Sequence, residues 1–183
     1  KKIIELLEKE TKFNITEVTL LSSKRSAGKT VQFKGREIII QEAKINSFEG
    51  VDIAFFSAGG EVSRQFVNQA VSSGAIVIDN TSKYRMAHDV PLVVPEVNAH
   101  TLKEHKGIIA VPNCSALQMV TALQPIRKVF GLERIIVSTY QAVSGSGIHA
   151  IQELKEQAKS ILAGEEVEST ILPAKKDKKH YPI

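Results

Sequence analysis

Hydrophobic residues of this chain gather into short continuous runs that polar turns separate. The runs over 51–56 (VDIAFF) and 75–79 (AIVID) are typical of parallel strands that are buried on both faces. Between them, apolar residues at helical spacing predict a helix that Gly74 ends. Further short runs predict strands over 18–21, 37–41, 92–94 and 107–111. Strand, glycine turn, helix and strand in this order indicate βαβ units, so we expect an α/β fold with a parallel sheet.

Helical patterns precede and follow this region. Residues 1–10 (KKIIELLEKE) place apolar side chains on one stripe and charges on the other face, which predicts an amphipathic helix. A second helix is expected from Ser115, its predicted N-cap, to about Phe130. Pro125 is expected to kink that helix or to end its regular part.

The last part of the chain has its own pattern. Residues 134–140 (RIIVSTY) are strongly β-prone and predict a strand. A glycine–serine turn at 144–147 leads into a pattern that predicts a helix ending at Gly164. The remaining residues, with a lysine cluster at 175–179, are interpreted as a loop or a partner-dependent arm.

Composition and charge describe an ordinary globular protein. With 183 residues, 43% of them hydrophobic and 24% charged, the chain can bury a core, and disordered and collagen-like classes are excluded. A net charge of +4 is too mild to predict a nucleic-acid partner. One cysteine excludes an internal disulfide, and the five histidines show no metal-ligand spacing, so no metal site is predicted. No apolar run is long enough to cross a bilayer. We therefore expect a soluble, cytoplasmic protein.

The single cysteine follows a predicted strand and begins a predicted helix, in the sequence Pro112-Asn113-Cys114-Ser115. Amide groups and the dipole at a helix N-terminus favour the thiolate, which is the nucleophilic form. The alternative is a small buried hydrophobic side chain, because cysteine is among the most buried residue types. Position alone leaves both interpretations open.

Two polar turns after predicted strands offer groups that bind ligands. The turn Ser57-Ala58-Gly59-Gly60 follows a buried strand, and glycines there let backbone amides approach a phosphate or a nicotinamide. Arg25 and Ser26 lie in the turn over 22–29, where a dinucleotide fold holds the adenosine ribose. An arginine and a serine at that place can hold the 2′-phosphate of NADP. An ordinary turn is the alternative in both cases.

Two further features are ambiguous. Residues 145–150 match G-x-G-x-x-A, but Glu165 and Glu166, about 20 residues on, do not end a second strand, so the βαβ context of a dinucleotide fingerprint is missing. Arg85 lies in a polar loop after a buried strand. Its planar guanidinium can clamp a phosphate or a carboxylate, and a surface ion pair is the alternative.

Six segments, taken together and in order, resemble one known family. They are SSKRSAGK (22–29), FSAGG (56–60), IVIDNTSKYRM (76–86), VPLVVPEVN (90–98), PNCSALQM (112–119) and STYQAVSGSG (138–147). Over essentially its whole length the chain is similar to bacterial aspartate-β-semialdehyde dehydrogenase. The resemblance implies an NADP-dependent enzyme that reductively dephosphorylates aspartyl-4-phosphate, for the synthesis of lysine, methionine and threonine.

The resemblance also implies roles for individual residues. Cys114 becomes the nucleophile that displaces phosphate and forms a thioester, and Gln141 a catalytic residue that contacts the substrate beside it. Substrate or its phosphate is implied to contact Arg85, Asn113 and Gln141. Cofactor-binding residues are implied to be Arg25, Ser26, Ser57, Gly59, Gly60, Asn113, Ser144 and Gly145.

The implied architecture is a Rossmann-like parallel-sheet domain over 1–113 that lacks its first strand, followed by the start of an α+β catalytic and dimerisation domain over 114–183. Truncation at both ends is expected, because the family's G-A-T-G-x-V-G loop has no counterpart here. The second-domain histidine that acts as acid/base, an arginine and a lysine are also missing, and Ala116 stands where threonine is expected.

Three expectations follow from that truncation. The isolated chain is expected to be inactive, the full-length protein to be a homodimer, and the sheet to have an open edge and exposed apolar surface. One alternative is N-acetyl-γ-glutamyl-phosphate reductase, which shares the cysteine mechanism. The other is a non-catalytic fragment that retains only folding or dimer-forming surface.

Overall fold

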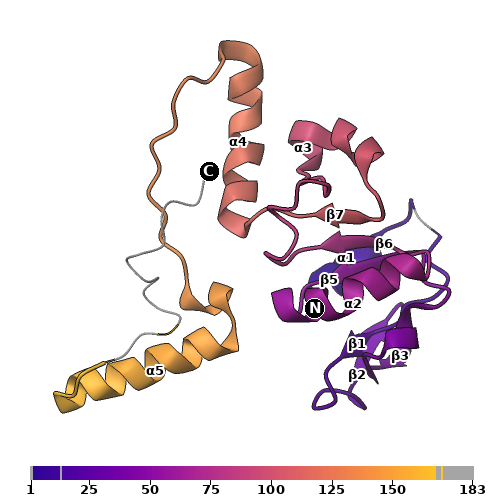
Figure 1. Ribbon diagram of the computed structural model, residues 1–183, viewed down its shortest axis with the longest axis horizontal. Helices are drawn as coiled ribbons and strands as arrows, with labels where there is room; N and C mark the ends of the chain where they lie inside the picture. The colour runs from indigo at the N-terminus through magenta and orange to yellow at the C-terminus, as the bar shows by residue number, and fades with distance from the viewer. Residues whose placement is uncertain (1, 13, 168–169, 171–183) are drawn as a thin grey trace. The chain divides into compact units, whose positions relative to one another are not determined.

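The computed structural model describes residues 2–12, 14–167 and 170 (Figure 1). The chain forms two compact units, Lys1–Glu133 and Arg134–Ile183, and each is described by itself. This division falls later than the predicted domain boundary after Asn113, because α4 (Cys114–Phe130) contacts α3 (Pro95–Asn98) of the first unit. The boundary itself stays a prediction.

The centre of the first unit is a parallel sheet. Its strands are β5 (Ile53–Phe56), β6 (Ile76–Asp79) and β7 (Ile108–Ala110), which confirms the strands and the parallel sheet that the apolar runs predict. They lie in the order β5-β6-β7. Helix α2 (Gly60–Ser72) joins β5 to β6 and covers one face of the sheet (Figure 1). The strand expected over 92–94 is reduced to one bridge, between Leu92 and Ala110.

The hydrophobic core lies between α2 and the sheet. The ring of Phe48, at the end of η1 (Ile45–Phe48), is 5.8 Å from that of Phe56 and 6.1 Å from that of Phe66. Small and β-branched side chains fill the remaining space and let the helix approach the strands closely. The whole buried cluster consists of Phe48, Ala54, Phe56, Phe66, Val67, Ala70, Ala75 and Val77.

The opposite face of the sheet is partly open. Along β5, Ala54 and Phe56 are buried under α2, whereas Ile53 and Phe55 point the other way and are 52% and 45% exposed. The prediction that this strand is buried on both faces is therefore wrong. The expected open edge and exposed apolar surface are confirmed, since β5 is an edge strand of its sheet.

A smaller region precedes the sheet. Strands β2 (Thr30–Phe33) and β3 (Arg36–Ile39) form an antiparallel hairpin. Its turn residues Lys34 and Gly35 have φ of +47° and +75°, as a type I′ turn requires. Strands β1 (Leu21–Ser22) and β4 (Gln41–Glu42) pair in parallel. The run over 37–41 thus divides between two strands, the strand expected over 18–21 begins only at Leu21, and β2 was not predicted.

The predicted first helix is confirmed as α1 (Lys2–Lys9). It lies beside the hairpin, where the Lys34 amide donates to Glu8 Oε1 at 2.8 Å. Between β6 and β7 the chain forms α3 and η2 (Ala99–Glu104).

Helix α4 corrects two expectations. Its N-cap is Asn113 rather than Ser115, because the Asn113 carbonyl oxygen Oδ1 accepts from the amides of Ser115 and Ala116 at 3.0 and 3.4 Å. Pro125 lies inside the helix, which continues to Phe130, so the expectation that Pro125 ends its regular part is wrong, whereas a kink there stays a prediction.

The second unit is formed by η3 (Val143–Ser146) and α5 (Ile148–Ala163), which confirms the predicted turn and helix. Gly164 ends α5 with φ of +75°, in the left-handed region. Residues 134–140 are not a strand, because the described part of this unit contains no other strand with which they could pair. The lysine cluster at 175–179 lies outside the described residues.

Candidate functional site

Cys114 is the first residue of α4 and lies at its N-terminus, with an exposed side chain. The thiol Sγ is 4.0 Å from Ser115 Oγ. Exposure excludes the buried-hydrophobe interpretation. Because Asn113 caps the helix, the positive end of the helix dipole is held next to the sulfur, where it stabilises negative charge.

Arg85 is held by two backbone carbonyls, one of which belongs to the segment that leads to Cys114. Its Nε donates to the carbonyl oxygen of Val111 at 2.9 Å, and its Nη2 donates to that of Asn80 at 3.2 Å. Val111 lies three residues before Cys114 in the chain. A guanidinium has five N–H donors, so two bonds to carbonyls leave others for an anion. Among the described residues Arg85 forms no ion pair, which was the alternative interpretation for it.

The glycine turn after β5 lies at the carboxyl ends of the strands, as the loop that carries Arg85 does. Gly59 has φ of +101°, and α2 begins at Gly60. A Cβ on Gly59 would meet nothing within 4 Å, so the backbone there is accessible to a ligand. The Asn80 amide donates to the carbonyl of Phe56 at 2.8 Å, directly before Ser57. The carboxyl ends of β5 and β6 therefore bring the glycine turn and the Arg85 loop together.

A buried polar cluster beneath this edge was not predicted. Asp79, the last residue of β6, accepts hydrogen bonds from Ser63 of α2 and from Thr81. The available signal in the sequence was an aspartate that ends an otherwise apolar strand and is followed by polar residues.

Other predicted site residues lie elsewhere. Arg25 and Ser26 occupy the turn after β1, which belongs to a different sheet from β5, β6 and β7. Arg25 is exposed, and the Ser26 amide donates to the Ser23 carbonyl at 2.9 Å. Gln141, Ser144 and Gly145 are exposed residues of the second unit, so their approach to Cys114 stays a prediction.

Three groups in the loop after β6 and on α2 have shifted pKa values. Burial raises the pKa of Tyr84, next to Arg85, and the charge of Asp79 adds to this effect. On the exposed side of α2, a hydrogen bond from Arg64 lowers the pKa of Glu61, and the same bond raises that of Arg64. The Glu61–Arg64 pair is fully solvated, so it contributes little to stability.

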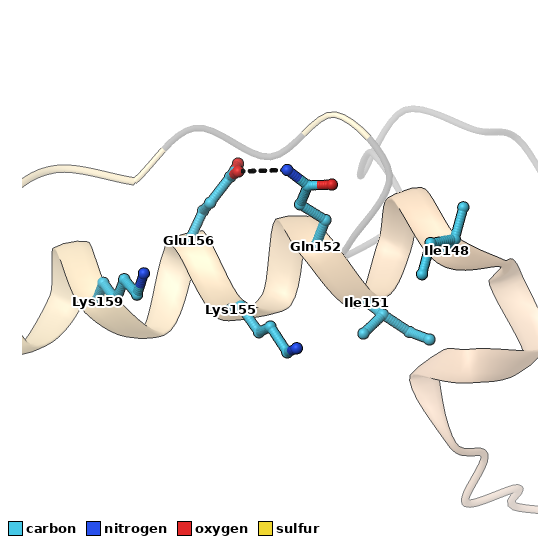
Figure 2. Close-up of a pocket in the computed structure, with 6 residues that line it drawn as sticks. All are labelled: Ile148, Ile151, Gln152, Lys155, Glu156 and Lys159. Atoms are coloured by element: carbon cyan, nitrogen blue, oxygen red, sulfur yellow. Dashed lines mark hydrogen bonds between the residues drawn. The ribbon is translucent and has the colours of Figure 1, made fainter.

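A shallow hollow lies on α5, which is distant in sequence from Arg85 and the glycine turn (Figure 2). All its walls come from one helix face, with a bond from Gln152 to Glu156 across it at 3.2 Å. Its lining residues are Ile148, Ile151, Gln152, Lys155, Glu156 and Lys159. It holds no predicted site residue.

Within the described residues, no helix combines the length and apolar content that a bilayer span needs. The same part of the chain contains no group of three or more metal-ligating side chains.

An open parallel sheet with a glycine turn and helix N-termini at its carboxyl edge places the chain in the class of α/β proteins that bind ligands at this edge. A family model described as "semialdehyde dehydrogenase, NAD binding domain" matches residues 1–105, and one described as "semialdehyde dehydrogenase, dimerisation domain" matches residues 123–183. The chain belongs to the semialdehyde dehydrogenase family. The Rossmann-like fold and the start of a dimerisation domain are thereby confirmed.

Individual relatives carry a more specific name. The chain is 61% identical over 171 residues to an aspartate-semialdehyde dehydrogenase of Bacillus subtilis, covering 93% of this chain and 49% of the relative. It is 50% identical over 167 residues to one of Aquifex aeolicus, covering 90% and 49%. A crystal structure of aspartate semialdehyde dehydrogenase II from Vibrio cholerae, complexed with ASA, matches with a TM-score of 0.78 and 43% identity, over 94% of this chain and 52% of that one. The chain thus spans about half the length of these relatives. They do not favour the N-acetyl-γ-glutamyl-phosphate reductase alternative.

Proposed function

We propose that the protein, at its natural length, converts L-aspartyl-4-phosphate into L-aspartate-4-semialdehyde with NADPH as reductant, in the synthesis of lysine, methionine and threonine. The observation that carries this proposal is the bond from Arg85 Nε to the Val111 carbonyl, which holds the guanidinium against the segment that leads to Cys114. Relatives up to 61% identical that are named for this activity support the substrate assignment.

The chemistry begins at Cys114. Its thiolate attacks the acyl carbon of aspartyl phosphate, the carbon–oxygen bond to phosphate breaks, and inorganic phosphate leaves with that electron pair. The product is a thioester on Cys114. Hydride addition to its carbonyl carbon gives a tetrahedral oxyanion, which collapses to the aldehyde and returns the electron pair of the carbon–sulfur bond to the thiolate.

Arg85 is proposed to bind the phosphate group. Its two bonds to carbonyls fix the plane of the guanidinium before substrate arrives, so little rotamer freedom is lost on binding. Asn113 is proposed to contact substrate or cofactor from the helix cap, next to Cys114. Gln141 is proposed to contact substrate from the second unit.

The residues present fit a dinucleotide cofactor. Ser57, Gly59 and Gly60 form a turn with open space at Gly59 and a helix N-terminus behind it, which suits a phosphate or nicotinamide. Arg25 and Ser26 are proposed to bind the 2′-phosphate that distinguishes NADP from NAD. When bound, the cofactor supplies the hydride. A Candida albicans aspartate semialdehyde dehydrogenase determined with NADP, at 30% identity and a TM-score of 0.56, supports the choice of NADP.

Ser144 and Gly145 are proposed to line the nicotinamide. The match of residues 123–183 to a dimerisation domain supports a homodimer. A cytoplasmic location is part of the proposal, and the bacterial origin of the Bacillus subtilis relative is consistent with it.

The test is a steady-state assay at natural length. NADP reduction is followed with aspartate semialdehyde and phosphate, and NAD is substituted in a parallel series. We expect Cys114→Ser to lose at least about 1,000-fold in kcat. The control Lys128→Ala, at an exposed position near the end of α4, is expected to keep wild-type turnover. Phosphate-independent NADP reduction, or a Cys114→Ser variant as active as wild type, would contradict the proposal.

A further inference from the structure

Three polar side chains are buried together beneath the candidate site, and the proposed reaction uses none of them. Ser63 and Asp79 are 0% exposed and Thr81 is 6% exposed. Burying polar groups is unfavourable unless each is hydrogen-bonded, so such a cluster persists only when its bonds are complete.

The bonds of this cluster connect one helix, one strand and one loop. Ser63 Oγ of α2 donates to Asp79 Oδ1 at 3.0 Å, and the Thr81 amide donates to the same oxygen at 2.9 Å. Thr81 Oγ1 lies 2.9 Å from Asp79 Oδ2 and 3.1 Å from Ser63 Oγ. The Lys83 amide donates to Thr81 Oγ1 at 3.2 Å, so the hydroxyl of Thr81 also holds the next part of the loop.

The loop that begins here ends at Arg85. The amide of its first residue, Asn80, donates to the Phe56 carbonyl at 2.8 Å, and the Asn80 carbonyl accepts from Arg85 Nη2. The Val111 amide donates to the Asp79 carbonyl at 2.8 Å, and the Val111 carbonyl accepts from Arg85 Nε. Both carbonyls that hold the guanidinium are therefore aligned by the strand end that Asp79 occupies.

The same loop lies close to the start of α2 at Gly60. A Cβ on Gly60 would lie 3.8 Å from Lys83 Cβ and 3.8 Å from Ser82 Oγ. The Ser63 amide donates to the Gly59 carbonyl at 3.2 Å, which links the turn to the buried cluster through α2.

We propose that Ser63, Asp79 and Thr81 form a positioning cluster, which fixes the loop over 80–85 against the glycine turn so that Arg85 is presented to the substrate phosphate. This inference rests on the proposed function, because it takes the anion at Arg85 to be that phosphate. Thr81 is the most informative member, since its hydroxyl contacts both other members and the Lys83 amide.

The test compares Thr81→Val, which keeps the shape and removes the hydroxyl, with Thr81→Ser, which keeps the hydroxyl. Both variants are made at natural length. We expect Thr81→Val to raise the KM for phosphate at least about tenfold with a smaller change in kcat, because the hydroxyl bond to the Asp79 carboxylate and the bond from the Lys83 amide are both lost and the loop is released. Thr81→Ser is expected to restore a KM near that of wild type.

Val67→Ala is the matched control for a purely structural effect. Val67 is fully buried in the same helix as Ser63 and belongs to the hydrophobic core. Its truncation is expected to lower Tm and to leave the KM for phosphate unchanged. The cluster has no positioning role if Thr81→Val lowers Tm and leaves the KM for phosphate unchanged. The same holds if Val67→Ala raises the KM for phosphate as much as Thr81→Val does.

A second measurement is independent of turnover. Labelling of arginines by phenylglyoxal, with peptide mass mapping, reports the accessibility of Arg85 with and without inorganic phosphate. We expect faster labelling of Arg85 in Thr81→Val and weaker protection by phosphate. If wild type has no phosphate-dependent activity but this change is seen, the positioning role stands and the proposed function fails. If Thr81→Val does not fold, Ser63→Ala takes its place, because it removes the Ser63 bond to Asp79. The KM for phosphate and the labelling of Arg85 are then measured in Ser63→Ala. Labelling of Arg85 that is the same in Ser63→Ala as in wild type overturns the inference.

Discussion

Replacing Gly107 with alanine tests how the strand that leads toward Cys114 is held against α2. A Cβ at this position would lie 2.7 Å from Val71 Cγ1 and 3.3 Å from Val71 Cγ2, closer than packed carbon atoms approach. Gly107 also has φ of +95°, which side chains rarely allow. Its carbonyl accepts from the Val77 amide at 2.8 Å, so the residue cannot shift without disturbing the start of β7.

The expected destabilisation has two separable parts. The unfavourable backbone conformation costs ~1–3 kcal/mol once a Cβ is present. Overpacking against Val71 adds ~1–3 kcal/mol. We therefore expect Gly107→Ala to lower the free energy of unfolding by about 2–6 kcal/mol.

Gly74 provides the matched control. Its φ of +96° is nearly that of Gly107, but a Cβ there would meet nothing within 4 Å. Gly74→Ala is thus expected to lower the free energy of unfolding only by the cost of the unfavourable backbone conformation. In urea denaturation at natural length, the two variants should differ by ~1–3 kcal/mol. Val71 packs against the core, so Val71→Ala has a cost of its own, and the comparison is the cost of Gly107→Ala in a Val71→Ala background, which should be smaller by that difference. Equal destabilisation by both glycine substitutions, or an unchanged cost of Gly107→Ala in the Val71→Ala background, would refute the steric argument.

Three further predictions concern the site. Arg85→Lys should raise the KM for phosphate at least about tenfold, because an ammonium cannot bond two carbonyls and an anion in one plane; an unchanged KM in a phosphate titration would contradict this. Asn113→Ala should cost ~1 kcal/mol in urea denaturation through loss of the cap of α4, whereas Asn113→Asp should cost little. Burial raises the pKa of Tyr84 above its ordinary value of 10.0, so the unfolded chain releases this proton first and stability falls as pH rises from 10.0 through the folded value. Tyr84→Phe should therefore lose less stability than wild type over that alkaline range, and parallel stability curves would contradict this.

The parallel core could be predicted because its signals are local. A continuous apolar run, a glycine turn and helical spacing already define β5, α2 and β6, and Gly74 marks the end of the helix. The exposure of Ile53 could not be predicted from its own run, because burial of one sheet face depends on what packs there.

The strand expected over 134–140 shows the limit of local propensity. A strand needs a pairing partner, and the described part of its unit offers none. The cap of α4 was misassigned to Ser115 because Asn113 and Ser115 are both good capping residues, and only the backbone geometry distinguishes them.

The candidate site was predictable only in part. Cys114 and the glycine turn have signals in the sequence, since a helix N-terminus and a strand end can both be inferred from patterns. The bonds of Arg85 to backbone carbonyls could not be inferred, because Val111 is brought to it by the pairing of β6 and β7. The cluster around Asp79 likewise joins residues that are 16 positions apart in the chain.

Trapping the thioester on Cys114 tests the proposed reaction most directly. At natural length, the protein is mixed with NADP and aspartate semialdehyde in the absence of phosphate, quenched in acid and mapped by peptide mass spectrometry. We predict an aspartyl group on the peptide that contains Cys114, formed together with reduced cofactor. When phosphate is added before the quench, this group is expected to be released from Cys114. Reduced cofactor that accumulates while Cys114 remains unmodified would contradict the proposed thioester mechanism.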